Sequence, residues 1–306
     1  MPGAMPEIIR PPRLRPGSTI GVAAISGPVD PARLDAGIAR LRERGYRVVE
    51  SANLRRAEGL FAGSDAERAE GYRALLRDRA VDAIFFARGG YGASRILDRL
   101  DGDEIAVNPK IHLGGSDLTA LFAFLAARGL PAFYGPMVAV EIAEQTGLDW
   151  ESVLSGDPPA EHRFGEQDVV AGGTGEGPLL GGCLSLLASL CGTPEAIRGE
   201  GRVLFWEDIG EEIYRLDRML TQLERSGTFD RLQAMIIGSV VSRDRAEPPQ
   251  DVRGFLRDRF RGAPFPVAAG FPAGHLFRPR TLPFLSGVRV NLDGAPRVSF
   301  EAPVVA

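Results

Sequence analysis

The sequence predicts an α/β protein with two domains: an N-terminal, mostly parallel sheet with flanking helices, and a smaller C-terminal α/β domain of mixed strands. Three observations support this prediction. Strand-like and helix-like segments alternate through the first half of the chain. The composition then changes to Gly, Pro, Asp and Glu over about residues 155–177, and further strand and helix patterns follow. With 306 residues, 44% of them hydrophobic, the chain is long enough to bury two cores.

The first half contains four short apolar runs with the length and composition of buried strands. They are Thr19–Ala24, Tyr46–Val49, Val81–Ala87 and Ile111–Gly114. Strand and helix units of this length imply right-handed crossovers and a Rossmann-like or flavodoxin-like sheet, with ligands at the carboxyl ends of the strands.

Periodicity and capping residues predict the helices between these strands. A helix follows Asp30-Pro31, because apolar residues recur on one face until Gly45 ends it. Ser64 and Glu67 have the spacing of a capping box, in which each side chain bonds an orphan amide of the first turn. Helices are therefore expected at about 31–45, 64–78, 92–100 and 118–128.

The domain boundaries follow from the change in composition. We expect an N-terminal domain over 1–155, an interdomain linker over 156–177 and a C-terminal domain over 178–306. In the C-terminal domain, strands are predicted at 203–206, 234–241, 267–269, 288–292 and 297–301. One helix is expected to be centred on Leu216, Met219, Leu220 and Leu223 and to end at Gly227, and another at about 251–261.

The charge balance limits the function. There are 36 Lys and Arg residues against 40 Asp and Glu, a net charge of -4, which argues against nucleic acid or an anionic membrane as a partner. The only lysine is Lys110, so a Walker-type phosphate loop is excluded. The histidines are His112, His162 and His275, and any histidine acid or base is one of these three.

Two cysteines, Cys183 and Cys191, have neither zinc-site pairing nor the density of a secreted scaffold, which fits a reducing compartment. The first ten residues lack an apolar targeting segment. The longest apolar run, Leu118–Ala127, is far shorter than the roughly 20 residues that span a bilayer. We therefore expect a cytoplasmic protein without a membrane partner.

The segment Arg88-Gly89-Gly90-Tyr91-Gly92 follows a predicted buried strand. It lacks the third glycine and the later acid of a dinucleotide-binding fingerprint. Two interpretations remain: a tight turn between strand and helix, or a loop whose bare amides stabilise a developing oxyanion.

Gly114-Gly115-Ser116-Asp117 places a serine where a predicted strand meets a helix. A sharp turn there would raise the hydroxyl above the carboxyl edge of the sheet, as in a nucleophile elbow. The alternative interpretation is that Ser116 only caps the helix.

The second half offers two further candidates. Glu207 and Asp208 are adjacent at the end of a predicted strand, so they point to opposite faces and at most one would serve a given site. His275 lies in a Gly- and Pro-rich loop, where it is either solvated or catalytic. We expect His112 to be packed in its strand and His162 to be exposed in the linker.

Together and in this order, these segments resemble the LD-carboxypeptidases of peptidase family S66, which include relatives that inactivate microcin C-type antibiotics. The matching segments are Gly17–Val22, Arg88–Gly92, Asn108–Lys110, Gly114–Leu121, Tyr134–Pro136, Gly181–Gly182, Phe205–Glu211, Tyr214–Leu220 and Gly270–His275. The resemblance covers nearly the whole chain. Gly115 and Cys183 depart from it, since family members often have an aromatic residue and an asparagine at those places.

The resemblance implies the roles of individual residues. Ser116 would be the nucleophile, His275 the base, and Glu207 the carboxylate that orients the imidazole. The backbone amides of Gly90 and Asp117 would form the oxyanion hole, while the Asp117 side chain caps the helix.

The implied activity is hydrolysis of the amide between the L-centre of a diamino acid and the terminal D-alanine of murein tetrapeptides, in peptidoglycan recycling. No metal or cofactor is implied, and the resemblance suggests a homodimer. One alternative is a microcin C-type immunity amidase of the same family, for which Trp206 or Phe277 would stack on adenine. Another is a noncatalytic two-domain protein that binds peptides or sugars.

Overall fold

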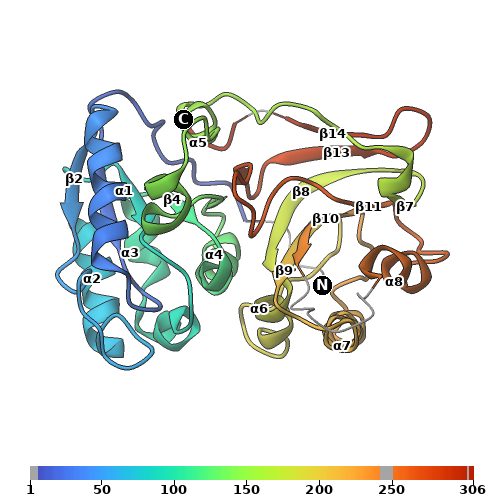
Figure 1. Ribbon diagram of the computed structural model, residues 1–306, viewed down its shortest axis with the longest axis horizontal. Helices are drawn as coiled ribbons and strands as arrows, with labels where there is room; N and C mark the ends of the chain where they lie inside the picture. Colours follow the sequence, from blue (N-terminus) through green and yellow to red (C-terminus); the bar gives the residue numbers. More distant parts are fainter. Residues whose placement is uncertain (1–5, 242–250, 302) are drawn as a thin grey trace. The chain divides into compact units, whose positions relative to one another are not determined.

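The structure is a computed structural model that describes residues 6–241, 251–301 and 303–306. The chain divides into two compact units (Figure 1). The N-terminal unit contains Met1–Asp157, Arg280–Leu285 and Pro303–Ala306, and the C-terminal unit contains Pro158–Pro279 and Ser286–Ala302. Two segments near the end of the chain, Arg280–Leu285 and Pro303–Ala306, therefore belong to the N-terminal unit, whereas we expected all of 178–306 to belong to the C-terminal domain. In the described ranges, no helix combines the length and the hydropathy needed to cross a membrane.

The N-terminal unit has a six-stranded sheet in the order β12-β5-β4-β3-β1-β2. Its strands are β1 (Thr19–Ala23), β2 (Arg47–Glu50), β3 (Ala83–Phe86), β4 (Ile111–Gly114), β5 (Phe133–Tyr134) and β12 (Leu282–Pro283). All neighbours are parallel except β12, which is antiparallel to β5. The predicted mostly parallel sheet is confirmed, and the carboxyl ends of β3 and β4 lie side by side.

Helices begin at both capping motifs that the sequence predicted. Asp30 accepts a hydrogen bond from the amide of Arg33, and Ser64 and Glu67 form both bonds of the capping box. The elements are α1 (Pro31–Glu43), α2 (Asp65–Arg77), the 3₁₀ helix η1 (Ala93–Arg99), α3 (Gly102–Val107), the 3₁₀ turn η2 (Ser116–Leu118), α4 (Thr119–Ala126), the π-helical turn η3 (Val138–Ile142) and α5 (Trp150–Ser155).

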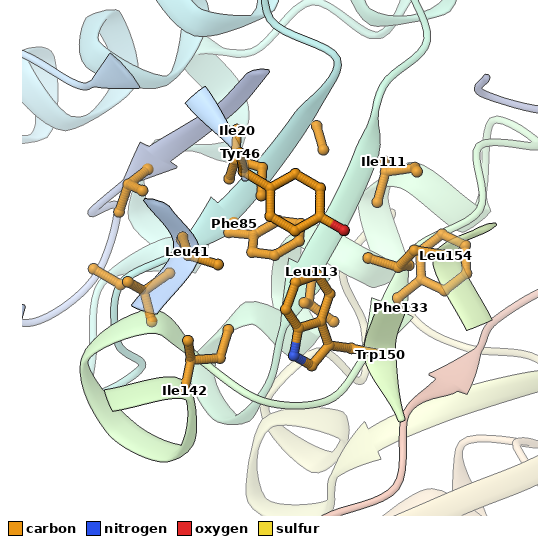
Figure 2. Packing of buried hydrophobic residues seen from close by; sticks show 14 of the residues in the cluster. Ile20, Leu41, Tyr46, Phe85, Ile111, Leu113, Phe133, Ile142, Trp150 and Leu154 are labelled. Carbon is orange, nitrogen blue, oxygen red and sulfur yellow. The ribbon is translucent and has the colours of Figure 1, made fainter. Parts of the chain in front are cut away.

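Alternate residues of the sheet face two different packing layers. On one face, the rings of Phe85 and Trp150 of α5 meet edge to face, with their centroids 5.2 Å apart. Both belong to the cluster of buried side chains drawn in Figure 2. On the other face, Phe86 and His112 pack with Tyr72 of α2. Because both faces of β3 and β4 are covered, these central strands are mostly apolar, which is why their positions could be predicted.

The C-terminal unit has an eight-stranded sheet in the order β6-β14-β13-β8-β9-β10-β11-β7. The strands are β6 (His162–Arg163), β7 (Val169–Ala171), β8 (Thr174–Cys183), β9 (Val203–Ile209), β10 (Ala234–Val241), β11 (Val267–Ala269), β13 (Gly287–Asn291) and β14 (Arg297–Phe300). Strands β8 to β11 pair in parallel, and the flanking strands pair antiparallel. Its helices are α6 (Leu184–Ser189), α7 (Ile213–Arg225), α8 (Val252–Arg259) and the 3₁₀ turn η4 (Glu166–Asp168). The mixed-strand prediction is confirmed.

The expected linker at 156–177 instead contributes strands to this sheet: β6, β7 and the first part of β8. Strand β8 was not predicted because it is rich in glycine, which is unfavourable in most strands. A Cβ at Gly175, Gly177 or Gly181 would collide with the carbonyl oxygen of Gln233, Gly201 or Phe205, so these positions need glycine because neighbouring backbone lies against them.

The expected exposure of His162 is also wrong. This histidine lies in β6, is half-buried, and its ring contacts Phe164 and Phe271 edge to face with centroids 4.7 and 5.1 Å away. His112 is packed in β4 as predicted, with a side chain 1% exposed.

Candidate active site

Ser116 occupies a sharp turn between β4 and α4. Its φ is 58°, in the left-handed region, which costs a residue with a side chain about 1 kcal/mol or more. Two hydrogen bonds hold this conformation: the Ser116 amide donates to the Tyr134 hydroxyl at 2.9 Å, and the Thr119 hydroxyl donates to the Ser116 carbonyl at 2.7 Å. Every residue from Ile111 to Ala126 is buried except Ser116. The turn therefore presents one hydroxyl from an otherwise closed segment, as a nucleophile elbow does.

The glycine loop after β3 lies against this turn. A Cβ built on Gly89 would be 2.8 Å from Cβ and 3.0 Å from Oγ of Ser116, and 3.4 Å from the Asp117 amide nitrogen. Only glycine fits at 89 without a shift of the serine. Gly90 has a φ of +108°, which favours glycine for a different reason, the backbone conformation itself. The structure thus brings Gly89 and Gly90 together with Ser116 and Asp117.

The prediction that the Asp117 side chain caps its own helix is wrong. The side chain instead connects three segments of the chain. It is 1% exposed and accepts hydrogen bonds from the Ser26 hydroxyl at 2.6 Å and from the Ala93 amide at 2.8 Å. Burial raises the pKa of its carboxyl, and these two bonds and the charge of Arg68 oppose that rise. The bond to Ala93 fixes the end of the glycine loop relative to the serine turn.

A buried arginine supports the same loop. Arg68 of α2 is fully buried, and it donates to the Gly92 carbonyl at 2.8 Å and to the Ile25 carbonyl. Its charge is paired with Asp65. Arg68 is not among the site residues predicted from the sequence, although an arginine one turn before Tyr72 on the apolar face of a predicted helix indicates a buried charge.

The C-terminal unit brings Glu207 and His275 together. Glu207 Oε2 accepts hydrogen bonds from Nδ1 of His275 at 2.7 Å and from the His275 backbone amide at 3.1 Å. The glutamate side chain is fully buried, and the histidine side chain is 23% exposed. Because a carboxylate only accepts hydrogen bonds, Nδ1 carries the proton, and in the neutral ring Nε2 keeps its lone pair. This is the tautomer that a general base needs.

Gly274 allows this close approach. It has a φ of +105°, and a Cβ there would lie 2.6 Å from Oε2 of Glu207 and 2.7 Å from Oγ of Ser239. A side chain at 274 would therefore displace the carboxylate from the imidazole.

Asp208 points away from the imidazole, as expected for the neighbour of Glu207 in a strand. It accepts hydrogen bonds from the amides of Ser185 at 2.7 Å and Ile209 at 2.8 Å, and burial raises the pKa of its carboxyl. Cys183 stands opposite Glu207 in the parallel register of β8 and β9. Burial, together with the charges of both carboxylates, raises the pKa of its thiol, which disfavours the reactive thiolate.

Trp206 and Phe277, the two residues predicted as possible platforms for adenine, differ in exposure. Trp206 is fully buried in the core of the C-terminal unit, with its indole N–H 3.2 Å from Sδ of Met235, so it is not available to stack on a ligand. Phe277 is 70% exposed. Within the described part of the chain, no group of three or more His, Cys, Asp or Glu side chains is arranged to hold a metal ion.

Two family models match the chain. One, described as the LD-carboxypeptidase N-terminal domain, matches residues 20–135. The other, the LD-carboxypeptidase C-terminal domain, matches residues 176–292.

Similar proteins point in the same direction. A putative carboxypeptidase of Streptomyces coelicolor is 40% identical, over 94% of each chain. A probable murein peptide carboxypeptidase of Bacillus subtilis is 34% identical, over 90% of this chain and 89% of that protein. Among solved structures, the microcin C7 self-immunity protein MccF in complex with aspartyl sulfamoyl adenosine has a TM-score of 0.87 and 25% identity, covering 97% of this chain and 99% of that chain.

Proposed function

The chain belongs to the LD-carboxypeptidase family, peptidase family S66, and is a serine-type carboxypeptidase hydrolase; from this premise we propose that it removes the terminal D-alanine from murein tetrapeptides in peptidoglycan recycling. The observation that supports this proposal most is the 2.7 Å bond between fully buried Glu207 and Nδ1 of His275. It prepares Nε2 as a base, which a protein that only binds peptides does not need.

The proposed mechanism uses these residues in two half-reactions. Nε2 of His275 accepts the hydroxyl proton of Ser116 while Oγ attacks the carbonyl carbon of the scissile amide. The amides of Gly90 and Asp117 donate to the resulting oxyanion. The carbon–nitrogen bond then breaks, the imidazolium gives its proton to the departing D-alanine amine, and the peptide remains as an ester on Ser116.

Water completes the cycle. His275 accepts a proton from a water molecule that attacks the ester, and the collapse of the second tetrahedral intermediate returns that proton to Ser116 Oγ. Glu207 keeps Nδ1 protonated throughout and stabilises the imidazolium. The products are D-alanine and the shortened peptide, and no cofactor takes part.

The first experiment measures D-alanine release from a murein tetrapeptide by the purified protein and by Ser116→Ala. We expect the variant to lose activity by a factor on the order of 10⁴ or more, because the nucleophile is removed. A fluorophosphonate probe should label the wild type and not the variant. Equal D-alanine release by the two proteins would contradict the proposal, and absence of labelling in both would favour a noncatalytic binder.

The structural similarity to MccF supports a second candidate, an amidase that cleaves an aminoacyl group from a sulfamoyl nucleoside or a related acyl adenylate analogue. Exposed Phe277 is the remaining candidate for an adenine platform. The ratio of kcat/KM for the tetrapeptide to that for aspartyl sulfamoyl adenosine separates the two candidates. Phe277→Ala should lower only the second value if the platform is used.

A further inference from the structure

Arg88 is an exposed arginine at the start of the glycine loop. Its Nη1 donates to the Pro28 carbonyl at 2.8 Å. No ion pair in the described ranges includes it, whereas Arg68 and Arg95, on the elements nearby, both pair with Asp65. A fixed but uncompensated guanidinium therefore lies at the carboxyl end of β3.

Gly27 shows how close this guanidinium is to the loop. A Cβ built on Gly27 would lie 3.2 Å from the Gly89 carbonyl oxygen, 3.6 Å from Nη1 of Arg88 and 3.7 Å from Cα of Gly90. The Arg88 guanidinium and the Gly90 backbone thus border the same small space. Gly89, between them in the chain, contacts the side chain of Ser116. The positive charge therefore borders the glycine loop, in which Gly89 contacts the serine turn and Gly90 carries the amide proposed to stabilise the oxyanion.

A carboxypeptidase must recognise a carboxylate one residue beyond the bond that it cuts. One residue spans about 3.8 Å, so the carboxylate lies close to the scissile carbonyl wherever that carbonyl binds. Arginine suits this ligand, because its planar N–H groups match the two oxygens of a carboxylate. The bond to Pro28 fixes one nitrogen of Arg88 and leaves other N–H groups of the guanidinium for a ligand.

We propose that Arg88 binds the terminal carboxylate of the substrate and thereby restricts the enzyme to the last residue of a peptide. This inference rests on the proposed function, since it concerns the same scissile bond. The chemical class of the ligand is the free carboxylate of a carboxy-terminal D-amino acid. The role is one of specificity, separate from the proton transfers assigned to His275.

The test compares two substrates that differ at one group: the tetrapeptide with a free carboxylate and the same peptide ending in a carboxamide. Arg88→Met should lower kcat/KM for the acid by 10- to 100-fold, as expected for loss of hydrogen bonds to a charged group. For the amide it should change kcat/KM by less than twofold. Arg88→Lys should recover part of the activity on the acid, because the charge returns without the planar geometry.

Arg33 provides a matched control. It is also an exposed arginine that donates to a backbone carbonyl, that of Ala139 at 2.9 Å, but it has an acidic partner, Glu144, at 2.8 Å. Arg33→Met should leave kcat/KM for both substrates within twofold of the wild type. An equal loss on acid and amide in Arg88→Met, or no loss on the acid, would overturn the inference.

Binding separates this inference from the proposed reaction. In the Ser116→Ala background, calorimetry measures Kd for the acid and the amide peptide with and without Arg88→Met. We expect the background protein to prefer the acid by 10-fold or more, and the preference to vanish with Arg88→Met. If the wild type releases no D-alanine but this preference is found, the proposed reaction fails while the carboxylate site stands. Equal affinity for acid and amide would refute the carboxylate site even in an active enzyme.

Discussion

The two units position their proposed catalytic groups in different ways. In the N-terminal unit, several neutral contacts hold Ser116 by its backbone: the bonds to Tyr134 and Thr119, and the packing of Gly89. In the C-terminal unit, one carboxylate, Glu207, accepts hydrogen bonds from both the ring and the backbone amide of His275. The serine is therefore held by neutral contacts of its backbone, whereas the imidazole is bonded to a charged side chain.

This difference predicts how each unit responds to substitution. A neutral hydrogen bond contributes about 1 kcal/mol, so the loss of one among several should move the serine only slightly. Loss of the Glu207 charge also removes the stabilisation of the imidazolium that forms during the reaction. Loss of one supporting contact should therefore lower turnover far more in the C-terminal unit than in the N-terminal unit.

Glu207→Gln tests the larger of these effects. The amide preserves the size of the side chain but removes the negative charge, and we expect kcat for the tetrapeptide to fall by about 10⁴-fold with little change in KM. Asp208→Asn is the matched control, because Asp208 is the adjacent carboxylate and accepts hydrogen bonds from the backbone amides of Ser185 and Ile209. It should lower the free energy of unfolding by about 1–3 kcal/mol and keep kcat within 10-fold. Similar losses of kcat in both variants would show that the charge of this strand end, rather than the bond to His275, controls turnover.

The strands that are buried on both faces could be predicted. Every residue of Val81–Ala87 except Asp82 is apolar, and this strand was placed correctly, with β3 at Ala83–Phe86. Strand β8 was not predicted because its glycines, such as Gly175 and Gly181, are required by close contacts with the backbone of segments distant in sequence. A local pattern of residues carries no sign of such contacts.

In the candidate site, too, some features could be predicted from the sequence and others could not. Ser116, Glu207 and His275 were chosen from motif resemblance, and the pairing of Glu207 with His275 joins positions that only the folded chain brings together. The role of the Asp117 side chain was predicted from its neighbours in sequence and was wrong, because its partners, Ser26 and Ala93, come from other loops. Local chemistry identified the groups, whereas their supporting contacts required the tertiary structure.

Tyr134→Phe tests the smaller effect, in the N-terminal unit. It leaves the Ser116 amide without the hydroxyl that accepts its hydrogen bond, and we expect kcat to fall by roughly 3- to 10-fold, since one neutral hydrogen bond is lost. Tyr72→Phe is the matched control: its hydroxyl lies 2.8 Å from Nε2 of His112 on the same sheet. That variant should lower stability without changing kcat. A loss of 10³-fold or more in Tyr134→Phe would mean that the serine depends on one contact as strongly as His275 does.

The smallest expected effect concerns stability alone and arises from His112 in the sheet of the N-terminal unit. Burial lowers the pKa of this histidine from 6.5 to about 3, because the charged ring would lose its solvation. Below pH 6.5 the unfolded chain therefore binds a proton that the folded chain does not, and stability falls as the pH falls.

Between pH 7.5 and 5.5 the loss should be about 1.4 kcal/mol, and it depends little on the native pKa, which lies well below this range. Urea unfolding of the wild type and His112→Gln at several pH values measures it, with the difference between the two proteins isolating the histidine. Burial raises the pKa of Asp117 and Asp208, so both carboxylates act with the opposite sign, and subtraction of the variant's profile removes their contribution. Parallel profiles for the two proteins would show that His112 is protonated in the folded state, contrary to its burial beside Tyr72.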